Sequence, residues 1–172
     1  MSAVRTPAAE GDPPRLAPMT AADLDAVMAL ENGVYPFPWT RGNFIDSLAA
    51  GYVAQLLRDV RDGHLLGYFV ALAGVDEMHL LNITVAPAHR RLGHARRMMD
   101  ALIACSRVAR AHRIWLEVRV SNDVALAVYQ RWGFREQGLR PGYYPAAHGR
   151  RENAVVMSLD IDPGAQRPDA LD

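Results

Sequence analysis

The chain has 172 residues, half of them hydrophobic and 22% charged, which is long enough to bury one sizeable core. All 19 basic residues are arginines, and they balance 19 acidic residues; the resulting zero net charge argues against an extended nucleic-acid-binding surface. The single cysteine, Cys105, excludes an intramolecular disulfide. The sequence contains no run of about 18 apolar residues, so we expect no membrane-spanning helix. Because no apolar segment near Met1 resembles a secretory signal, we expect a cytoplasmic protein.

The two ends of the chain differ in composition from the middle. Residues 1–14 hold three prolines among small and charged residues, and residues 162–172 have the same character. We expect both to be disordered tails, because neither contains enough apolar residues to offset the entropy of ordering. The segment between them, 15–161, is predicted to form one domain.

The first half of this domain predicts a short strand, two helices and a pair of strands. In chain order these are a strand at 15–18, a helix after the capping-box sequence 20–23, a helix from Thr40 to Leu48, and strands at 52–60 and 65–75. The two prolines within 35–39 break the first helix, because the residue before a proline avoids helical geometry. The turn 61–64 suits a hairpin between the two strands.

The second half alternates strands and helices. It predicts strands at 79–85, 114–120, 134–138 and 152–161, and helices at 93–112 and 122–132. The strand at 114–120 alternates strictly, with Ile114, Leu116, Val118 and Val120 on one face and Glu117 on the other. Helices between strands predict an α/β fold, a mixed sheet with helices on both of its faces.

The segment 80–99 carries the clearest functional signal. A strand runs into a turn with several arginines and one glycine, Gly93, and an amphipathic helix follows. This order exposes backbone N–H groups at the positive end of a helix, which is a phosphate-binding construction. The turn matches neither the P-loop nor the dinucleotide-binding fingerprint. From these residues alone, a solvated basic helix start remains an equal alternative.

The pattern Arg90-x-x-Gly93-x-Ala95, placed between a strand and a helix, resembles the acetyl-CoA site of the GNAT N-acetyltransferases. Further motifs resemble the RimI-type branch, which acetylates the N-terminal alanine of a small-subunit ribosomal protein. They are the segments 37–39, 115–122, 127–129, 133–134, 143–145 and 149–157. The similarity covers roughly 16–159.

The resemblance implies the GNAT fold, a single mixed and mostly antiparallel sheet in which two neighbouring strands splay apart to bind acetyl-CoA. It also implies the acetyl-CoA-binding residues. The backbone of a β-strand pairs with the pantetheine arm, the turn holds the diphosphate, and an asparagine bonds a pantetheine amide. These are Ile83, Thr84 and Val85; Arg91, Leu92, Gly93, His94, Ala95 and Arg96; and Asn122. Leu92 and Ala95 depart from residues frequent in the family, but both positions contribute backbone donors.

By the same resemblance, Glu117 is the general base and Tyr129 the general acid for the departing thiolate. Without the resemblance, Glu117 would be read as a partner of Arg119 on a solvated face, Tyr129 as a core aromatic, and Asn122 as a helix cap. Cys105 lies among apolar helix positions and is expected to be a buried structural thiol, so we expect direct transfer without an acyl-enzyme.

Two aromatic loops are expected, by resemblance, to form the walls of a peptide site. One contributes Tyr35, Phe37 and Trp39, and the other Tyr143 and Tyr144. Such walls exclude water and pack on a peptide backbone, although loop packing alone would also explain them.

The preferred hypothesis is therefore an acetyl-CoA-dependent N-acetyltransferase whose partner is the N-terminal alanine of a ribosomal protein. The alternatives are a GNAT enzyme for lysines, other N-termini or small amines, and a non-catalytic acyl-CoA-binding module. The six histidines show no metal-ligand spacing, so no metal is expected. We expect no direct contact with nucleic acid or membrane, and a monomer.

Overall fold

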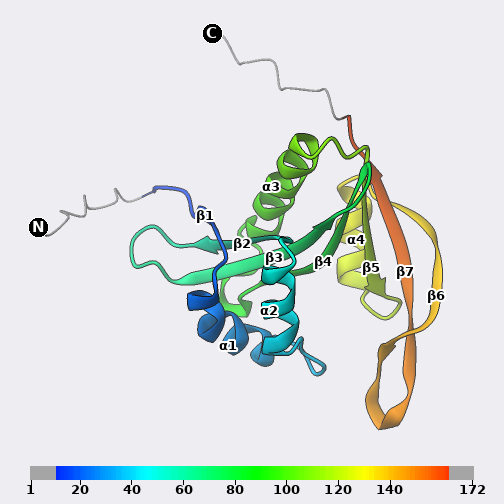
Figure 1. The fold of residues 1–172 in the computed structure, drawn as a ribbon. Coiled ribbons are helices and arrows are strands. Elements are labelled where there is room, and N and C mark those ends of the chain that lie inside the picture. Colours follow the sequence, from blue (N-terminus) through cyan, green and yellow to red (C-terminus); the bar gives the residue numbers. More distant parts are fainter. Residues whose placement is uncertain (1–10, 163–172) are drawn as a thin grey trace, which may run out of the picture. The chain divides into compact units, whose positions relative to one another are not determined.

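The computed structural model describes residues 11–162. Of the two predicted tails, only residues 11–14 and Asp162 fall in this range. The described chain forms seven strands in the order β1-β2-β3-β4-β5-β7-β6, together with four α-helices (Figure 1). It clusters into two compact units. Unit 1 comprises residues up to Val70 together with Asn82–Met99, and unit 2 comprises Ala71–Leu81 together with the residues from Asp100 onward. Strands β3 and β4 and helix α3 contribute residues to both units.

Unit 1 holds the N-terminal strands and helices. They are β1 (Arg15–Pro18), α1 (Leu24–Val34), α2 (Arg41–Ala49), β2 (Val53–Arg58), most of β3 (Leu65–Ala73), the end of β4 (Glu77–Val85) and the start of α3 (His94–Val108). Strand β1 pairs antiparallel with β2, from Arg15 opposite Arg58 to Pro18 opposite Gln55. Thr40 caps α2, because its hydroxyl accepts from the Asn43 N–H at 3.1 Å. The strand at 15–18 and the Thr40 cap are confirmed.

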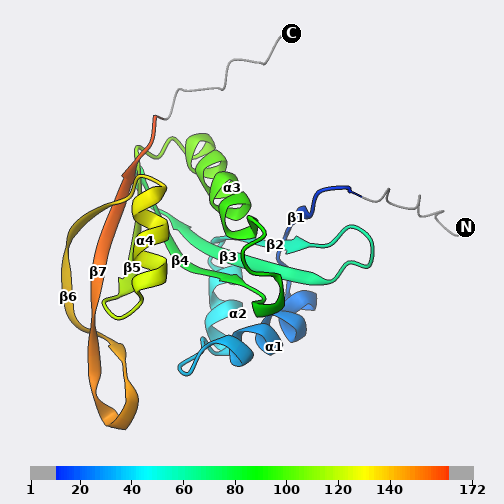
Figure 2. The same ribbon diagram turned by 180° about the vertical axis from the view of Figure 1, so that it is seen from behind.

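The core of unit 1 lies between α1, α2 and the strands β2 and β3, which run side by side in both views (Figures 1 and 2). Phe44 of α2 is fully buried and its ring contacts those of Trp39 (5.2 Å between centroids) and Tyr68 (5.8 Å). On β3, Gly67 allows close packing. A Cβ there would lie 2.5 Å from the Thr84 carbonyl oxygen and 3.0 Å from Cε of Met98. A side chain at this position would therefore force β4 and α3 away from β3.

Unit 2 holds the C-terminal elements: β5 (Arg113–Arg119), α4 (Asp123–Arg131), β6 (Arg135–Pro145) and β7 (Arg151–Asp160). The start of β4 pairs parallel with β5, from Glu77 opposite Arg113 to Leu80 opposite Leu116, and both strands continue beyond this ladder. Strand β7 pairs antiparallel with β5 and with β6. The predicted alternation of β5 is confirmed, since Ile114, Leu116 and Val118 are all buried. Val120 was wrongly placed with them; it follows the strand and is exposed.

Two predicted elements end more than two residues away from their predicted ends. The strand predicted at 134–138 extends to Pro145, because two irregularities in register let it keep pairing with β7. Tyr143 and Tyr144 therefore lie in a strand and not, as predicted, in a loop. The helix predicted to reach His112 ends at Val108, because Arg110 takes a left-handed conformation (φ 57°) and the Ala111 N–H bonds back to the Ser106 carbonyl at 2.9 Å. This is a helix stop that glycine usually provides, so the sequence carried no signal for it.

The mixed α/β class and the mostly antiparallel sheet are confirmed. None of the helices between residues 11 and 162 is both long enough and apolar enough to cross a bilayer.

Candidate active site

The predicted phosphate turn lies in unit 1, between β4 and α3. A short 3₁₀ turn at Pro87–His89 is followed by two residues with positive φ, Arg91 (62°) and Gly93 (79°), and α3 begins at His94. The N–H of Arg97 donates to the Gly93 carbonyl at 3.0 Å. The N–H groups of Gly93, His94 and Ala95 therefore precede the first helical hydrogen bond, where a helix has no internal acceptors for them.

The surface of this turn is open and rich in cations. A Cβ added at Gly93 would meet no atom within 4 Å, and Leu92 is 64% exposed. The arginines Arg90, Arg91, Arg96 and Arg97 are all exposed. Burial and the positive charge of His89 and Arg97 lower the pKa of His94. This set of exposed N–H donors and guanidinium groups fits a diphosphate, which is the chemistry expected of a coenzyme A site.

The predicted pantetheine strand is the end of β4, also in unit 1. The Thr84 side chain is buried, and its Oγ1 lies 2.8 Å from the hydroxyl of Tyr35. The same hydroxyl lies 3.3 Å from the Ile83 carbonyl oxygen. The Thr84 side chain is therefore held inside unit 1 by Tyr35, so any pairing of this segment with a ligand strand would use its main chain. Burial raises the pKa of Tyr35, so its phenol remains a donor.

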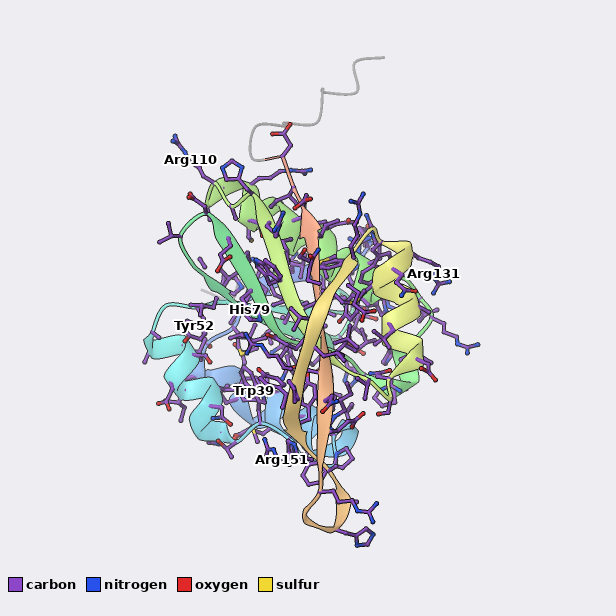
Figure 3. All side chains as sticks on the ribbon, turned by 90° about the vertical axis from the view of Figure 1, so that its right-hand side faces the viewer. Trp39, Tyr52, His79, Arg110, Arg131 and Arg151 are labelled. Atoms are coloured by element: carbon purple, nitrogen blue, oxygen red, sulfur yellow. The ribbon has the colours of Figure 1, made fainter. Side chains whose placement is uncertain are left out.

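Glu117 lies in β5 of unit 2, where its carboxylate meets two basic side chains. His79 Nε2 lies 2.6 Å from Glu117 Oε2, and Arg140 Nε lies 3.5 Å from Glu117 Oε1. The Glu117 side chain is 6% exposed, against 28% for His79 and 53% for Arg140. Figure 3 marks His79 on β4. The alternative reading, a glutamate on a solvated face, is therefore wrong.

Arg119, the other half of that alternative, lies against a different carboxylate. Its Nη1 lies 3.0 Å from Glu152 and 2.9 Å from the Pro145 carbonyl oxygen, and its guanidinium stacks over the Tyr144 ring at 4.5 Å. Hydrogen bonding from Ser121 and the charge of Arg119 lower the pKa of Glu152. These contacts tie β5, β6 and β7 together beside Glu117.

Tyr129 and Asn122 belong to α4 and its N-terminus. The Tyr129 ring packs on Trp132 (5.8 Å) and Phe134 (5.5 Å). The Asn122 side-chain oxygen accepts from the Ala125 N–H at 3.1 Å and caps the helix. The alternative reading of Asn122 as a helix cap is confirmed. The contact of Asn122 with a pantetheine amide stays a prediction.

The residues predicted to form the peptide walls divide between the two units. In unit 1, Phe37 is 44% exposed, whereas the Trp39 ring packs on Phe44 and the main-chain N–H of Trp39 donates to Glu31 at 2.8 Å. In unit 2, Tyr143 is 40% exposed and its ring meets that of Tyr144 at 4.9 Å.

Three polar residues beside predicted site residues were missed: His79, Arg140 and Glu31. The first two surround Glu117, and Glu31 binds the backbone of Trp39. The parallel register places His79 opposite Trp115, on the same face as Glu117. The sequence of one strand does not show which residue of the next strand lies opposite. The only sequence signal for His79 was its alternation with apolar neighbours.

Two further predictions concern other kinds of chemistry, an acyl-enzyme formed on Cys105 and a bound metal ion. Cys105 is half-buried and not, as predicted, fully buried; this partial burial raises the pKa of its thiol, which disfavours the thiolate form of a nucleophile. Among residues 11–162, no group of three or more histidines, cysteines and carboxylates converges as metal ligands would.

Comparison with known proteins identifies the family. The model of the acetyltransferase (GNAT) family matches residues 24–134. The [ribosomal protein bS18]-alanine N-acetyltransferase of Escherichia coli strain K12 is 33% identical over 143 residues, covering 83% of this chain and 95% of the relative. The crystal structure of the ribosomal-protein-S18-alanine N-acetyltransferase from Escherichia coli superposes with a TM-score of 0.78 at 30% identity, over 92% of this chain and 98% of that one.

A more distant structure shows the same fold with a ligand. The structure of yncA from Salmonella typhimurium with its cofactor acetyl-CoA matches with a TM-score of 0.72 at 18% identity, over 93% of this chain and 100% of that one. The family match and the enzymes among the relatives support a catalytic protein over the non-catalytic alternative, and acetyl-CoA is the acetyl donor of these enzymes. The chain therefore belongs to the acetyltransferase (GNAT) family and is an acetyl-CoA-dependent N-acetyltransferase.

Proposed function

We propose that this enzyme acetylates the N-terminal alanine of ribosomal protein bS18 in the cytoplasm. One observation carries the proposal: the bS18-alanine N-acetyltransferase of Escherichia coli matches this chain over nearly its whole length in both sequence and fold. The motifs that resemble the RimI-type branch extend through the predicted peptide walls as well as the acetyl-CoA turn, which supports a shared acceptor.

The acetyl donor would be held by backbone groups from β4 to α3. The N–H groups of the turn 91–96 would bind its diphosphate, with the neighbouring arginines adding charge. The main chain of Ile83–Val85 would pair with the pantetheine arm as an added strand would, and Asn122 would bond an amide of that arm. When bound, coenzyme A supplies an activated acetyl thioester.

Glu117 would then remove the protons that the acceptor amine must lose, the first of them to make the amine neutral. A free α-amino group has a pKa near 8 and a lysine one of about 10.4, so neutralising them at pH 7 costs roughly 1.4 and 4.6 kcal/mol respectively. A single carboxylate suits the smaller of these costs, which favours an N-terminal acceptor. His79 would hold one carboxylate oxygen at 2.6 Å and so fix the direction in which the other accepts a proton.

Tyr129 would complete the proton balance. A protonated α-amine loses two protons on becoming an amide. Glu117 would take the first before attack and release it to solvent. As the amine nitrogen bonds to the acetyl carbon and the carbon–sulfur bond breaks, the second amine proton would go to Glu117 and the phenol proton of Tyr129 to the departing thiolate. Glu117 then gives its proton to solvent and Tyr129 takes one from solvent, which restores both groups for the next turnover. Tyr35, Phe37, Trp39, Tyr143 and Tyr144 would line the path of the peptide and exclude water from the reacting atoms.

The decisive experiment compares three peptides that present alanine, methionine, or an internal lysine with a blocked N-terminus. We expect acetyl-CoA-dependent acetylation of the alanine peptide at its α-amine, followed by mass spectrometry, with kcat/KM well above the other two. Acetylation of the lysine peptide with equal efficiency would instead support the broader alternative. The Glu117→Gln variant serves as the control for uncatalysed transfer.

A further inference from the structure

A buried carboxylate in unit 1 has no part in the mechanism above. Glu31, in the last turns of α1, is only 1% exposed. One main-chain and two side-chain donors converge on its carboxylate. They are the main-chain N–H of Trp39 at 2.8 Å, the hydroxyl of Tyr68, and the side-chain amide nitrogen of Asn82 at 3.2 Å from Oε2. All three donors are neutral. A buried carboxylate is costly unless its environment replaces the water that it loses, and here hydrogen bonds from neutral groups replace it.

The donors come from three segments that are distant in the sequence. Trp39 lies in the loop between α1 and α2, Tyr68 in β3 and Asn82 in β4. Burial and the hydrogen bond to Glu31 raise the pKa of Tyr68, so its hydroxyl remains a donor. The carboxylate therefore links the loop to two strands of the sheet.

Glu31 makes two of the main-chain hydrogen bonds of the segment Tyr35–Trp39. Pro36 and Pro38 have no N–H, so the segment can donate backbone hydrogen bonds only from Tyr35, Phe37 and Trp39. The Tyr35 N–H donates to the main-chain carbonyl of Glu31 at 3.1 Å, and the Trp39 N–H donates to its carboxylate. One residue thus holds the segment at both ends.

The same network reaches the strand assigned to acetyl-CoA. Asn82, which donates to Glu31, accepts from the hydroxyl of Thr84 at 2.9 Å. Thr84 in turn lies 2.8 Å from the hydroxyl of Tyr35, at the start of the segment. The chain of hydrogen bonds therefore closes on itself, from Glu31 through β4 and back to the segment.

We propose that Glu31 is a positioning residue for the acceptor peptide, which holds the Tyr35–Trp39 segment in register with β4. This inference rests on the proposed function, because it takes that segment as a wall of the peptide site. The position of the β4 backbone also depends on its neighbouring strands. Loss of Glu31 should therefore displace the peptide wall much more than the acetyl-CoA strand.

The test uses Glu31→Gln in the full chain. Glutamine has the same shape but replaces one acceptor oxygen by a donor, so one of the converging donors loses its acceptor. We expect KM for the alanine peptide to rise about tenfold or more, as for a lost buried hydrogen bond, while the dissociation constant of acetyl-CoA changes less than about twofold. Steady-state kinetics and isothermal titration calorimetry measure the two quantities.

Two further variants keep the result interpretable. Tyr68→Phe removes one donor and leaves the buried ring, so it should raise peptide KM in the same direction by less, and it decides the matter if Glu31→Gln does not fold. Ser106→Ala removes a buried hydroxyl in unit 2 that bonds the Leu102 carbonyl at 2.7 Å, and should leave both constants unchanged. An unchanged peptide KM in folded Tyr68→Phe and Glu31→Gln, or an equal loss of acetyl-CoA affinity, would overturn the inference.

Failure of the proposed function would look different. It would show as a wild-type enzyme that prefers the methionine or lysine peptide to the alanine peptide. The same variants, assayed with the acceptor that the wild type does prefer, would then still test the role of Glu31.

Discussion

The side chains of His79 and Glu117 meet at 2.6 Å, although the two residues are 38 positions apart in the sequence. Strand β4 carries one and β5 the other, and the parallel register between these strands sets their approach. The Glu117 side chain is nearly buried, whereas His79 remains partly exposed and is the more accessible member of the pair. The first two predictions concern this pair.

Replacing Glu117 by glutamine removes the proposed base but keeps the size of the side chain. We expect kcat to fall roughly 10²–10⁴-fold, the usual contribution of a general base. The dissociation constant of acetyl-CoA, measured by calorimetry, should change little. A parallel loss of acetyl-CoA affinity would mean that Glu117 has a structural role.

Replacing His79 tests whether it orients Glu117. Because the contact uses Nε2, glutamine can place a neutral donor at a similar position, whereas alanine cannot. We expect His79→Ala to lower kcat about tenfold, by loss of one hydrogen bond to a charged group, and His79→Gln to retain most of the activity. Equal activity in all three proteins would show that the contact has no bearing on catalysis.

The turn before α3 should require glycine at position 93. Gly93 has a φ of 79°, and an alanine there would be strained by about 1–2 kcal/mol, which would shift the backbone donors of the turn. We expect Gly93→Ala to weaken acetyl-CoA binding about tenfold, because that strain must be absorbed where the diphosphate binds. Loss of the acetyl-CoA-dependent rise in melting temperature would report the change.

Gly51→Ala is a matched control for that variant. Gly51 has a φ of 76°, and a Cβ there would also meet nothing within 4 Å, but it follows α2 and lies outside the proposed acetyl-CoA site. It should lose similar stability and keep its affinity for acetyl-CoA. If both variants bind equally weakly, the effect comes from general destabilisation.

Acid should weaken unit 2 through Glu152. The hydrogen bond from Ser121 and the charge of Arg119 lower the pKa of Glu152 in the folded state, so its contribution to stability is present above the ordinary glutamate pKa of about 4.3. That contribution is lost as the pH falls through the lower, folded-state pKa. Urea unfolding between pH 6 and pH 3 should show a smaller loss of stability in Glu152→Gln than in the wild type. An identical loss in both proteins would exclude the contribution.

Local patterns predicted most of the elements correctly. The capped start of α2, the alternation in β5 and the end of α1 before the prolines at 36 and 38 all depend on residues within one or two turns of each other. The left-handed Arg110 and the register irregularities of β6 have no such local signature. The end of α3 and the strand position of Tyr143 and Tyr144 were therefore wrong.

By itself, the sequence determined the family, the mixed α/β class and the glycine-containing turn. Each of these follows from short motifs or local patterns, in which the type and spacing of neighbouring residues are enough. Only the tertiary structure decided the partners of the polar side chains. Glu117 meets His79 and Arg140, Arg119 lies against Glu152, and Glu31 links the loop to two strands. Those pairings depend on strand register and helix packing, which bring together residues tens of positions apart, and no single segment of the chain encodes them.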